Sequence, residues 1–273
     1  MSATMPMLKT LVCVLALMLL GLSASAHDYW LLPEKFNPVP GEAVNVRLYF
    51  GDNFQKPEDE RPFQKDRTPG LVMVSSGETR DLAATTPDQQ KPLLRVNFPR
   101  PGSYLLALDR NAQTIDLKAE DFNEYLEHEG LGDILELRKQ SNQLKTPGRE
   151  RYSRNIKAVV QVGTSVDEVP LRTLGRTLEL VPQQNPYALK PGADLTVQVL
   201  FEGTALAGRE VAAYNLTAGK LTQQQARTDK DGRVTFRVQP GQSMVRLVHM
   251  RACQKDCAGV DWESYWSSLT FGL

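Results

Sequence analysis

Apolar and polar residues alternate along much of the chain, in short runs interrupted by proline and glycine. Between 36 and 51, turn residues lead into a run in which Val44, Val46 and Leu48 share one face. Residues 93–109 give two short runs around a Pro-Gly turn. Because successive side chains of a strand point to opposite faces, these runs predict strands with one buried face. Repeated short strands of this kind are typical of an antiparallel β-sandwich.

One segment has a different period. From 119 to 142, apolar side chains recur at three- and four-residue spacing, including Phe122, Tyr125, Leu126 and Ile134. This spacing predicts an amphipathic helical insertion. Gly130 and Gly132 favour a break within it, because glycine is a poor helix former.

The second half of the chain repeats the strand pattern of the first. Residues 189–216 and 226–250 each predict strands separated by glycine turns. The entry Pro-Gly-x-x-Leu/Val-x-Val occurs at 40–46 and again at 191–197. We therefore predict a mostly β fold of two immunoglobulin-like or transthyretin-like antiparallel β-sandwich modules with a short helical insertion. The expected boundaries are 27–163 for the first module, 164–177 for a linker and 178–273 for the second module.

The start of the chain resembles an export signal. Lys9 precedes a run of apolar residues at 11–22, which is shorter than the roughly 20 residues that span a bilayer. Ala24-Ser25-Ala26 follows and matches the small-x-small pattern of a cleavage site. We expect 1–26 to be a signal peptide cleaved after Ala26, a mature protein that begins at His27, and a periplasmic location.

Charge argues against polyanionic partners. The chain carries 32 basic and 32 acidic residues, and only Lys9 of these lies in the predicted signal. A nearly neutral mature chain has no basic excess that would attract nucleic acid or anionic lipid. The sequence also predicts no membrane span in the mature chain.

Two cysteines follow the signal region, Cys253 and Cys257. An even number in an exported chain favours a disulfide between them, which would need a turn to bring their Cα atoms close. Binding of a metal by the two thiolates is the alternative.

The chain has three histidines, and two of them are candidate metal ligands. A mature amino-terminal His27 would offer its α-amine and its ring Nδ1 to one ion. His249, at the end of an apolar run, would complete a three-nitrogen brace suited to nickel, copper or, less tightly, cobalt or zinc. The alternatives are that His27 follows the cleavage site by chance and that His249 is a half-buried imidazole. His128 lies among glutamates and is expected on the surface.

Four further residues are candidates for this site. Asp28 and Trp30 follow His27 directly, and a hairpin around the cysteine loop would bring Trp262 and Glu263 near His249. The sequence shows no phosphate-binding glycine loop, nucleophile elbow or His-Glu-x-x-His zinc helix. No catalytic residue is assigned.

Seven segments, in order, resemble a bacterial family called domain of unknown function 4198. They are AHDYWLLPEKF, PGEAVNVRLYFGDNF, EDFNEYLEHEGL, RERYSRNIKA, NPYALKPG, GRVTFRV and the LVHM to DWESYWSSLTF region. The resemblance implies a periplasmic protein associated with nickel or cobalt uptake. It places emphasis on His27 with Tyr29 and Trp30, and on His249 with Trp262 and Trp266. It implies packing and ion pairing for Tyr152, Arg154 and Lys157.

The resulting hypothesis is a periplasmic protein that binds nickel, cobalt or copper through His27 and His249, beside an inner-membrane metal-uptake transporter. Capture or delivery of an ion needs no catalysis, so we do not expect an enzyme. Two alternatives remain open. One is a copper-brace oxidase that uses the same histidines. The other is a carbohydrate- or protein-binding sandwich with Tyr29, Trp30, Trp262 and Trp266 as an aromatic platform.

Overall fold

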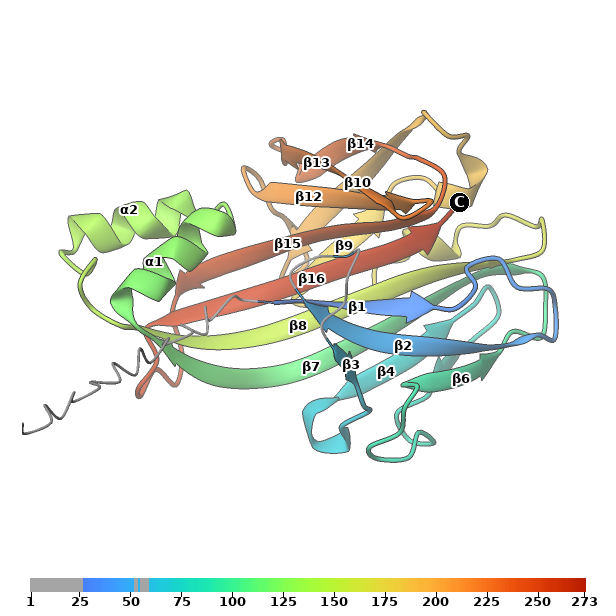
Figure 1. Cartoon of the computed structure of the whole chain (residues 1–273), viewed down its shortest axis with the longest axis horizontal. Helices are drawn as coiled ribbons and strands as arrows, with labels where there is room; N and C mark the ends of the chain where they lie inside the picture. Colours follow the sequence, from blue (N-terminus) through green and yellow to red (C-terminus); the bar gives the residue numbers. More distant parts are fainter. Residues whose placement is uncertain (1–26, 52–53, 55–58) are drawn as a thin grey trace, which may run out of the picture.

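The computed structural model describes residues 27–51, 54 and 59–273, so the predicted signal peptide lies outside the described residues. An eight-stranded sheet runs through the whole protein (Figure 1). Its strands, in spatial order, are β13 (Lys220–Arg227), β12 (Glu210–Thr217), β15 (Gln242–Ala252), β16 (Trp262–Gly272), β8 (Gly148–Val162), β7 (Gly102–Leu117), β4 (Gly70–Val74) and β5 (Thr79–Asp81). We call it the central sheet.

Two smaller sheets pack on opposite faces of the central sheet. The N-terminal sheet consists of β1 (Asp28–Pro33), β2 (Ala43–Gly51), β3 (Asp59–Arg61) and β6 (Leu94–Asn97). The C-terminal sheet consists of β9 (Leu178–Pro182), β10 (Asp194–Phe201), β11 (Thr204–Ala205) and β14 (Arg233–Arg237). The prediction of a mostly β, sandwich-like fold is confirmed.

The alternation of side chains along β7 shows how one sheet serves two cores. Leu106 and Leu108 pack with Val46 and Leu48 of the N-terminal sheet. Leu105, on the other face, packs with residues of the C-terminal sheet. Burying both faces explains why this strand reads as a continuous apolar run rather than as an alternating one.

The two halves of the chain meet in the central sheet. Strand β16 pairs in parallel with β8, from Trp262 beside Glu150 to Thr270 beside Ala158. All other strand pairs among the described residues are antiparallel. The predicted modules therefore share one sheet, and the segment 164–177 connects β8 to β9 with the short 3-10 helix Val169–Leu171. Two further 3-10 helices are Lys65–Arg67 and Pro186–Ala188.

The predicted helical insertion is present as α1 (Ala119–His128) and α2 (Gly132–Gln140), and the break between them contains Gly130 and ends at Gly132. Phe122 and Tyr125 of α1 pack with Trp262 and Trp266 of β16. On the same face of β16, Ser268 and Thr270 donate hydrogen bonds to the backbone carbonyls of Tyr29 and Leu31 in β1. The helices therefore cover the same face of the central sheet as the N-terminal sheet does. No helix in the described part of the chain is long and apolar enough to cross a membrane.

A buried ion pair ties the C-terminal sheet to the central sheet. Lys157 Nζ lies 2.5 Å from Glu179 Oε1, and both side chains are almost completely buried. Glu179 also accepts hydrogen bonds from the backbone N–H groups of Leu174 and Arg176. The ion pairing expected for Lys157 is thus confirmed. Burial of both charges is tolerated because each is paired and hydrogen-bonded.

The predicted disulfide is also present. Cys253 and Cys257 are bridged, with their Cα atoms 5.8 Å apart, in the loop between β15 and β16. Arg151 anchors this loop by donating hydrogen bonds to the carbonyl groups of Lys255 and Asp256.

Candidate functional site

The structure does not bring His27 and His249 together. The His249 ring lies 4.4 Å from that of Phe201 in the C-terminal sheet. The His27 ring lies 4.4 Å from that of Phe50 in the N-terminal sheet. Since these two sheets cover opposite faces of the central sheet, the predicted site shared by the two imidazoles is wrong. The residues that the structure describes contain no group of three or more His, Cys, Asp or Glu able to hold a metal.

The additional candidates are also separated. Trp262 points toward the helices, away from His249, while Glu263 pairs with Arg251 at 3.0 Å and with Arg151. Asp28 lies 3.1 Å from the Arg246 guanidinium, which also pairs with Glu129. Trp30 is fully buried against Phe54 and Met244. The predicted aromatic platform is therefore not formed, because Trp30 and Trp262 belong to separate parts of the core.

His249 has the character of a core residue. It is 6 % exposed, and its Nδ1 has no hydrogen-bond partner within the described residues. Burial, together with the nearby Arg209 and Arg251, lowers its pKa to about 4, although Asp133 opposes this shift. The imidazole is consequently neutral at physiological pH.

We expect the ring protons of His249 to show no titration in NMR spectra between pH 8 and 5.5, with the variant His249→Gln used to assign its resonance. The unfolded chain takes up this proton near pH 6.5 and the folded chain only near pH 4. The residue's contribution to stability is therefore complete above pH 6.5 and is lost as pH falls toward 4. A titration midpoint above 6 would show that the ring is solvated.

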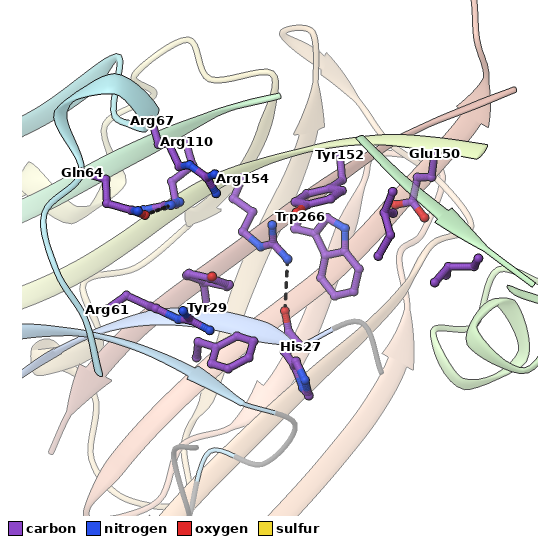
Figure 2. A pocket seen from close by; sticks show the side chains of 13 residues that line it. His27, Tyr29, Arg61, Gln64, Arg67, Arg110, Glu150, Tyr152, Arg154 and Trp266 are labelled. Atoms are coloured by element: carbon purple, nitrogen blue, oxygen red, sulfur yellow. Dashed lines mark hydrogen bonds between the residues drawn. The ribbon is translucent and has the colours of Figure 1, made fainter. Parts of the chain in front are cut away.

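A cavity of about 350 Å³ opens on the other face of the central sheet, between the N-terminal sheet and the helices (Figure 2). His27, which precedes β1, lines one side together with Tyr29, Phe50 and Arg61 of the N-terminal sheet. Two strands of the central sheet form the base. Arg110, Ile115 and Leu117 come from β7, and Glu150, Tyr152 and Arg154 come from β8. Trp266 of β16 and the segment with Gln64 and Arg67 complete the lining.

Period-two geometry places the β8 residues. Glu150, Tyr152 and Arg154 alternate with Arg151 and Ser153, so all three point to the cavity face. Opposite them, the pairing of β7 with β8 shifts between Arg110 and Gln113. Such a bulge changes the direction of side chains and is common beside binding sites.

Arg110 is a buried cation without an anion. Its side chain is 8 % exposed, its Nη2 donates to Gln64 Oε1 at 2.6 Å, and its Nη1 has no partner in the described part of the chain. No carboxylate of the described residues lies within ion-pair distance of it. Burial lowers the pKa of this guanidinium, and repulsion from Arg154 and Arg67 lowers it further. Buried guanidinium groups are normally paired, so this one requires a ligand or an explanation.

Arg154 lies between Arg110 and the tryptophan. Its guanidinium lies over the rings of Tyr29 (4.4 Å) and Tyr152 (4.7 Å), and it faces Trp266 at 5.4 Å. Its Nη2 donates to the His27 carbonyl at 3.3 Å, whereas its buried Nε has no partner among the described residues. The aromatic rings therefore hold this cation in place and leave donors available.

Glu150 lies at the opposite end of the cavity from Arg110 and Arg67 (Figure 2). It is 3 % exposed, and its Oε1 accepts hydrogen bonds from Ser264 and, at 3.3 Å, from Tyr125. Burial raises its pKa to about 7, against the lowering effects of these hydroxyls and of Arg154. Near neutral pH its carboxyl group can therefore donate a hydrogen bond when protonated and only accept hydrogen bonds when ionised.

The family resemblance implied packing and ion pairing for Tyr152 and Arg154, and neither Arg110 nor Glu150 was predicted as a site residue. The available signal was the alternating Glu150-x-Tyr152-x-Arg154 pattern, which places charged and aromatic groups where a buried strand normally has aliphatic ones. The residues expected at the amino terminus, His27 and Tyr29, do line the cavity, but not as partners of His249.

A family model described as "Domain of unknown function (DUF4198)" matches residues 24–251, which include all residues that line the cavity except Trp266. No curated protein matches the chain.

Proposed function

We propose that this chain, which belongs to the DUF4198 family, is a binding protein for a small organic carboxylate. The observation that carries the proposal is the unpaired, buried Arg110 beside Arg154 in a cavity walled by aromatic rings. Arginine is suited to carboxylates because its planar fork makes two parallel hydrogen bonds. An anion between these guanidiniums would relieve their mutual repulsion and supply the missing acceptors.

The rest of the cavity supports an organic ligand rather than a bare inorganic ion. Tyr29, Phe50, Tyr152 and Trp266 offer flat apolar surfaces next to the cations. Binding sites for small molecules commonly combine an apolar lining with a few placed polar groups. We assign no reaction to the site, since a carrier or sensor needs binding and release only.

A transition metal remains a second candidate, and His27 is the observation that favours it. Cleavage after Ala26 would leave the His27 amine and ring at the cavity. Four arginines line the same space, and they would repel a bare divalent cation. An ion of nickel, cobalt or copper is therefore more compatible with the site when an anionic chelator carries it. Accessory service to an inner-membrane uptake transporter would follow from such binding.

A periplasmic location is part of this proposal. The signal-like segment ending at Ala26 supports export, and the Cys253–Cys257 disulfide is suited to an oxidising compartment.

Calorimetric titration of the processed protein tests the proposal. We expect benzoate, succinate or citrate to bind with a dissociation constant below 1 mM, and benzamide to bind at least tenfold more weakly than benzoate. Nickel chloride, alone and premixed with citrate, distinguishes a bare metal site from a chelate site. Equal binding of benzoate and benzamide, or binding of inorganic phosphate without any of the carboxylates, would overturn the proposal.

A further inference from the structure

The cavity has two ends of opposite polarity. At one end, Arg110 and Arg154 have buried donors without partners in the described residues. At the other end, Glu150 has both of its hydrogen bonds on Oε1, and its Oε2 makes none within the described part of the chain. No cationic side chain described in the structure lies within ion-pair distance of Glu150. A single ligand could therefore accept hydrogen bonds from the arginines at one end and donate a hydrogen bond to Glu150 at the other.

The two ends are a fixed distance apart because they lie on one strand. Arg154 follows Glu150 by four positions along an extended strand, which places their Cα atoms about 13 Å apart. Side chains extend into this interval from both ends, so the remaining space suits one aromatic ring or a body of similar length. Tyr152 and Trp266 lie between the ends and line the space that such a body would fill (Figure 2).

The Glu150 end is held rigidly. Tyr125 stacks on Trp266 with ring centroids 6.0 Å apart and planes 7° apart, and its hydroxyl donates to Glu150. The Trp266 indole N–H donates to Ser264 Oγ at 3.1 Å, and Ser264 donates to Glu150. These bonds orient the carboxyl and leave its second oxygen for a ligand. A carboxylate oxygen without a protein donor can accept a hydrogen bond from a ligand, so a ligand with a donor at this position gains affinity.

We propose that the ligand is bifunctional: a carboxylate that binds Arg110 and Arg154, joined by a flat apolar body to a hydroxyl or amine that donates a hydrogen bond to Glu150. This inference rests on the proposed carboxylate-binding function and specifies the other end of the ligand. The raised pKa of Glu150, about 7, is consistent with it, because burial of the carboxyl outweighs the lowering effects of Ser264, Tyr125 and Arg154.

Benzoate and 4-hydroxybenzoate are the probes, since they differ only at the end that would meet Glu150. Calorimetry at pH 8, where Glu150 is mostly ionised, should show 4-hydroxybenzoate binding about tenfold more tightly than benzoate. In Glu150→Leu this preference should fall to twofold or less, while benzoate affinity stays the same or improves. Glu150→Gln, which keeps the shape of the side chain, should give an intermediate preference and serves if the leucine variant does not fold.

The outcomes separate the two claims. Equal affinities for the two probes in the wild-type protein, or an undiminished preference in both Glu150 variants, would overturn the bifunctional ligand and leave carboxylate binding intact. Failure of the wild-type protein to bind either probe would instead contradict the proposed function itself. Glu124→Gln, a change at an exposed position on α1, is the matched control and should keep the tenfold preference.

Discussion

Replacing Arg110 with methionine should weaken benzoate binding by at least 100-fold and should stabilise the ligand-free protein. The loss corresponds to about 2.7 kcal/mol, a moderate value for removing a buried charge from an anion. The gain has the same origin. Without a bound anion, Arg110 is a buried cation that faces Arg154 and Arg67 and has no carboxylate partner among the described residues, so its removal relieves a cost of burial and repulsion.

The opposite signs make this test specific to a binding role. Substituting an arginine with a structural role would lower the free energy of unfolding. Substituting an arginine that is kept for binding should raise the free energy of unfolding of the ligand-free protein. Calorimetry and urea unfolding measure the two effects, and Arg110→Lys should fall between, because lysine keeps the charge without the planar fork. Arg95→Met, at an exposed position on β6, is the matched control and should change neither quantity. A destabilised Arg110→Met that still binds benzoate would assign the residue to the core.

Glu150 should make the stability of the ligand-free protein fall as pH rises from 4.5 to 8. Its pKa is about 7 in the folded protein and near 4.5 when unfolded. Between these values the folded state holds a proton that the unfolded state has released, so raising the pH favours unfolding. The stabilisation is complete below about pH 4.5 and is lost as pH rises through 7, with a total of roughly 3 kcal/mol.

Urea unfolding of wild-type protein and Glu150→Gln at several pH values isolates this effect. Other titrating groups contribute equally to both proteins, so the difference between them reports Glu150 alone. The variant should gain stability relative to wild type by about 3 kcal/mol between pH 4.5 and 8. Glu124→Gln should show no pH-dependent difference. If Glu150→Gln also shows none, the carboxyl is solvated and the cavity end is open to water.

Local sequence pattern predicted the strands, the helical insertion and the disulfide because each depends on nearby residues. Val44, Val46 and Leu48 form one buried face of β2, as their spacing indicates. The shared central sheet could not be predicted in this way. It depends on the parallel pairing of β16 with β8, and their paired residues are more than 100 positions apart in the chain.

The error about His27 and His249 has a geometric cause. The shared site required the amino terminus to pack against the last hairpin on the side of His249. Successive residues of a strand point to opposite faces of the sheet, however, and this alternation decides on which face a side chain lies. Val248 and Met250 point toward the helices, so His249 between them points to the C-terminal sheet. His27 lies on the helix-bearing face, and the central sheet separates the two rings.

The cavity was missed for a different reason. Arginine and glutamate are common on surfaces, and the sequence alone does not show that Arg110 and Glu150 are buried without ionic partners. Glu150, Tyr152 and Arg154 line a cavity because the N-terminal sheet and α1 both fold over their face of β8. Without these two elements the same side chains would lie on an exposed strand face.

Locating a bound carboxylate is the most direct test of the account. Crystals of the processed protein soaked with 4-bromobenzoate should show anomalous scattering from bromine inside the cavity, on the Glu150 side of Arg154. The carboxylate should lie within hydrogen-bond distance of Arg110 and Arg154, and the ring should lie beside Tyr152 and Trp266. Bromine found only outside this cavity, or a carboxylate directed away from both arginines, would contradict the assignment of the cavity as a carboxylate site.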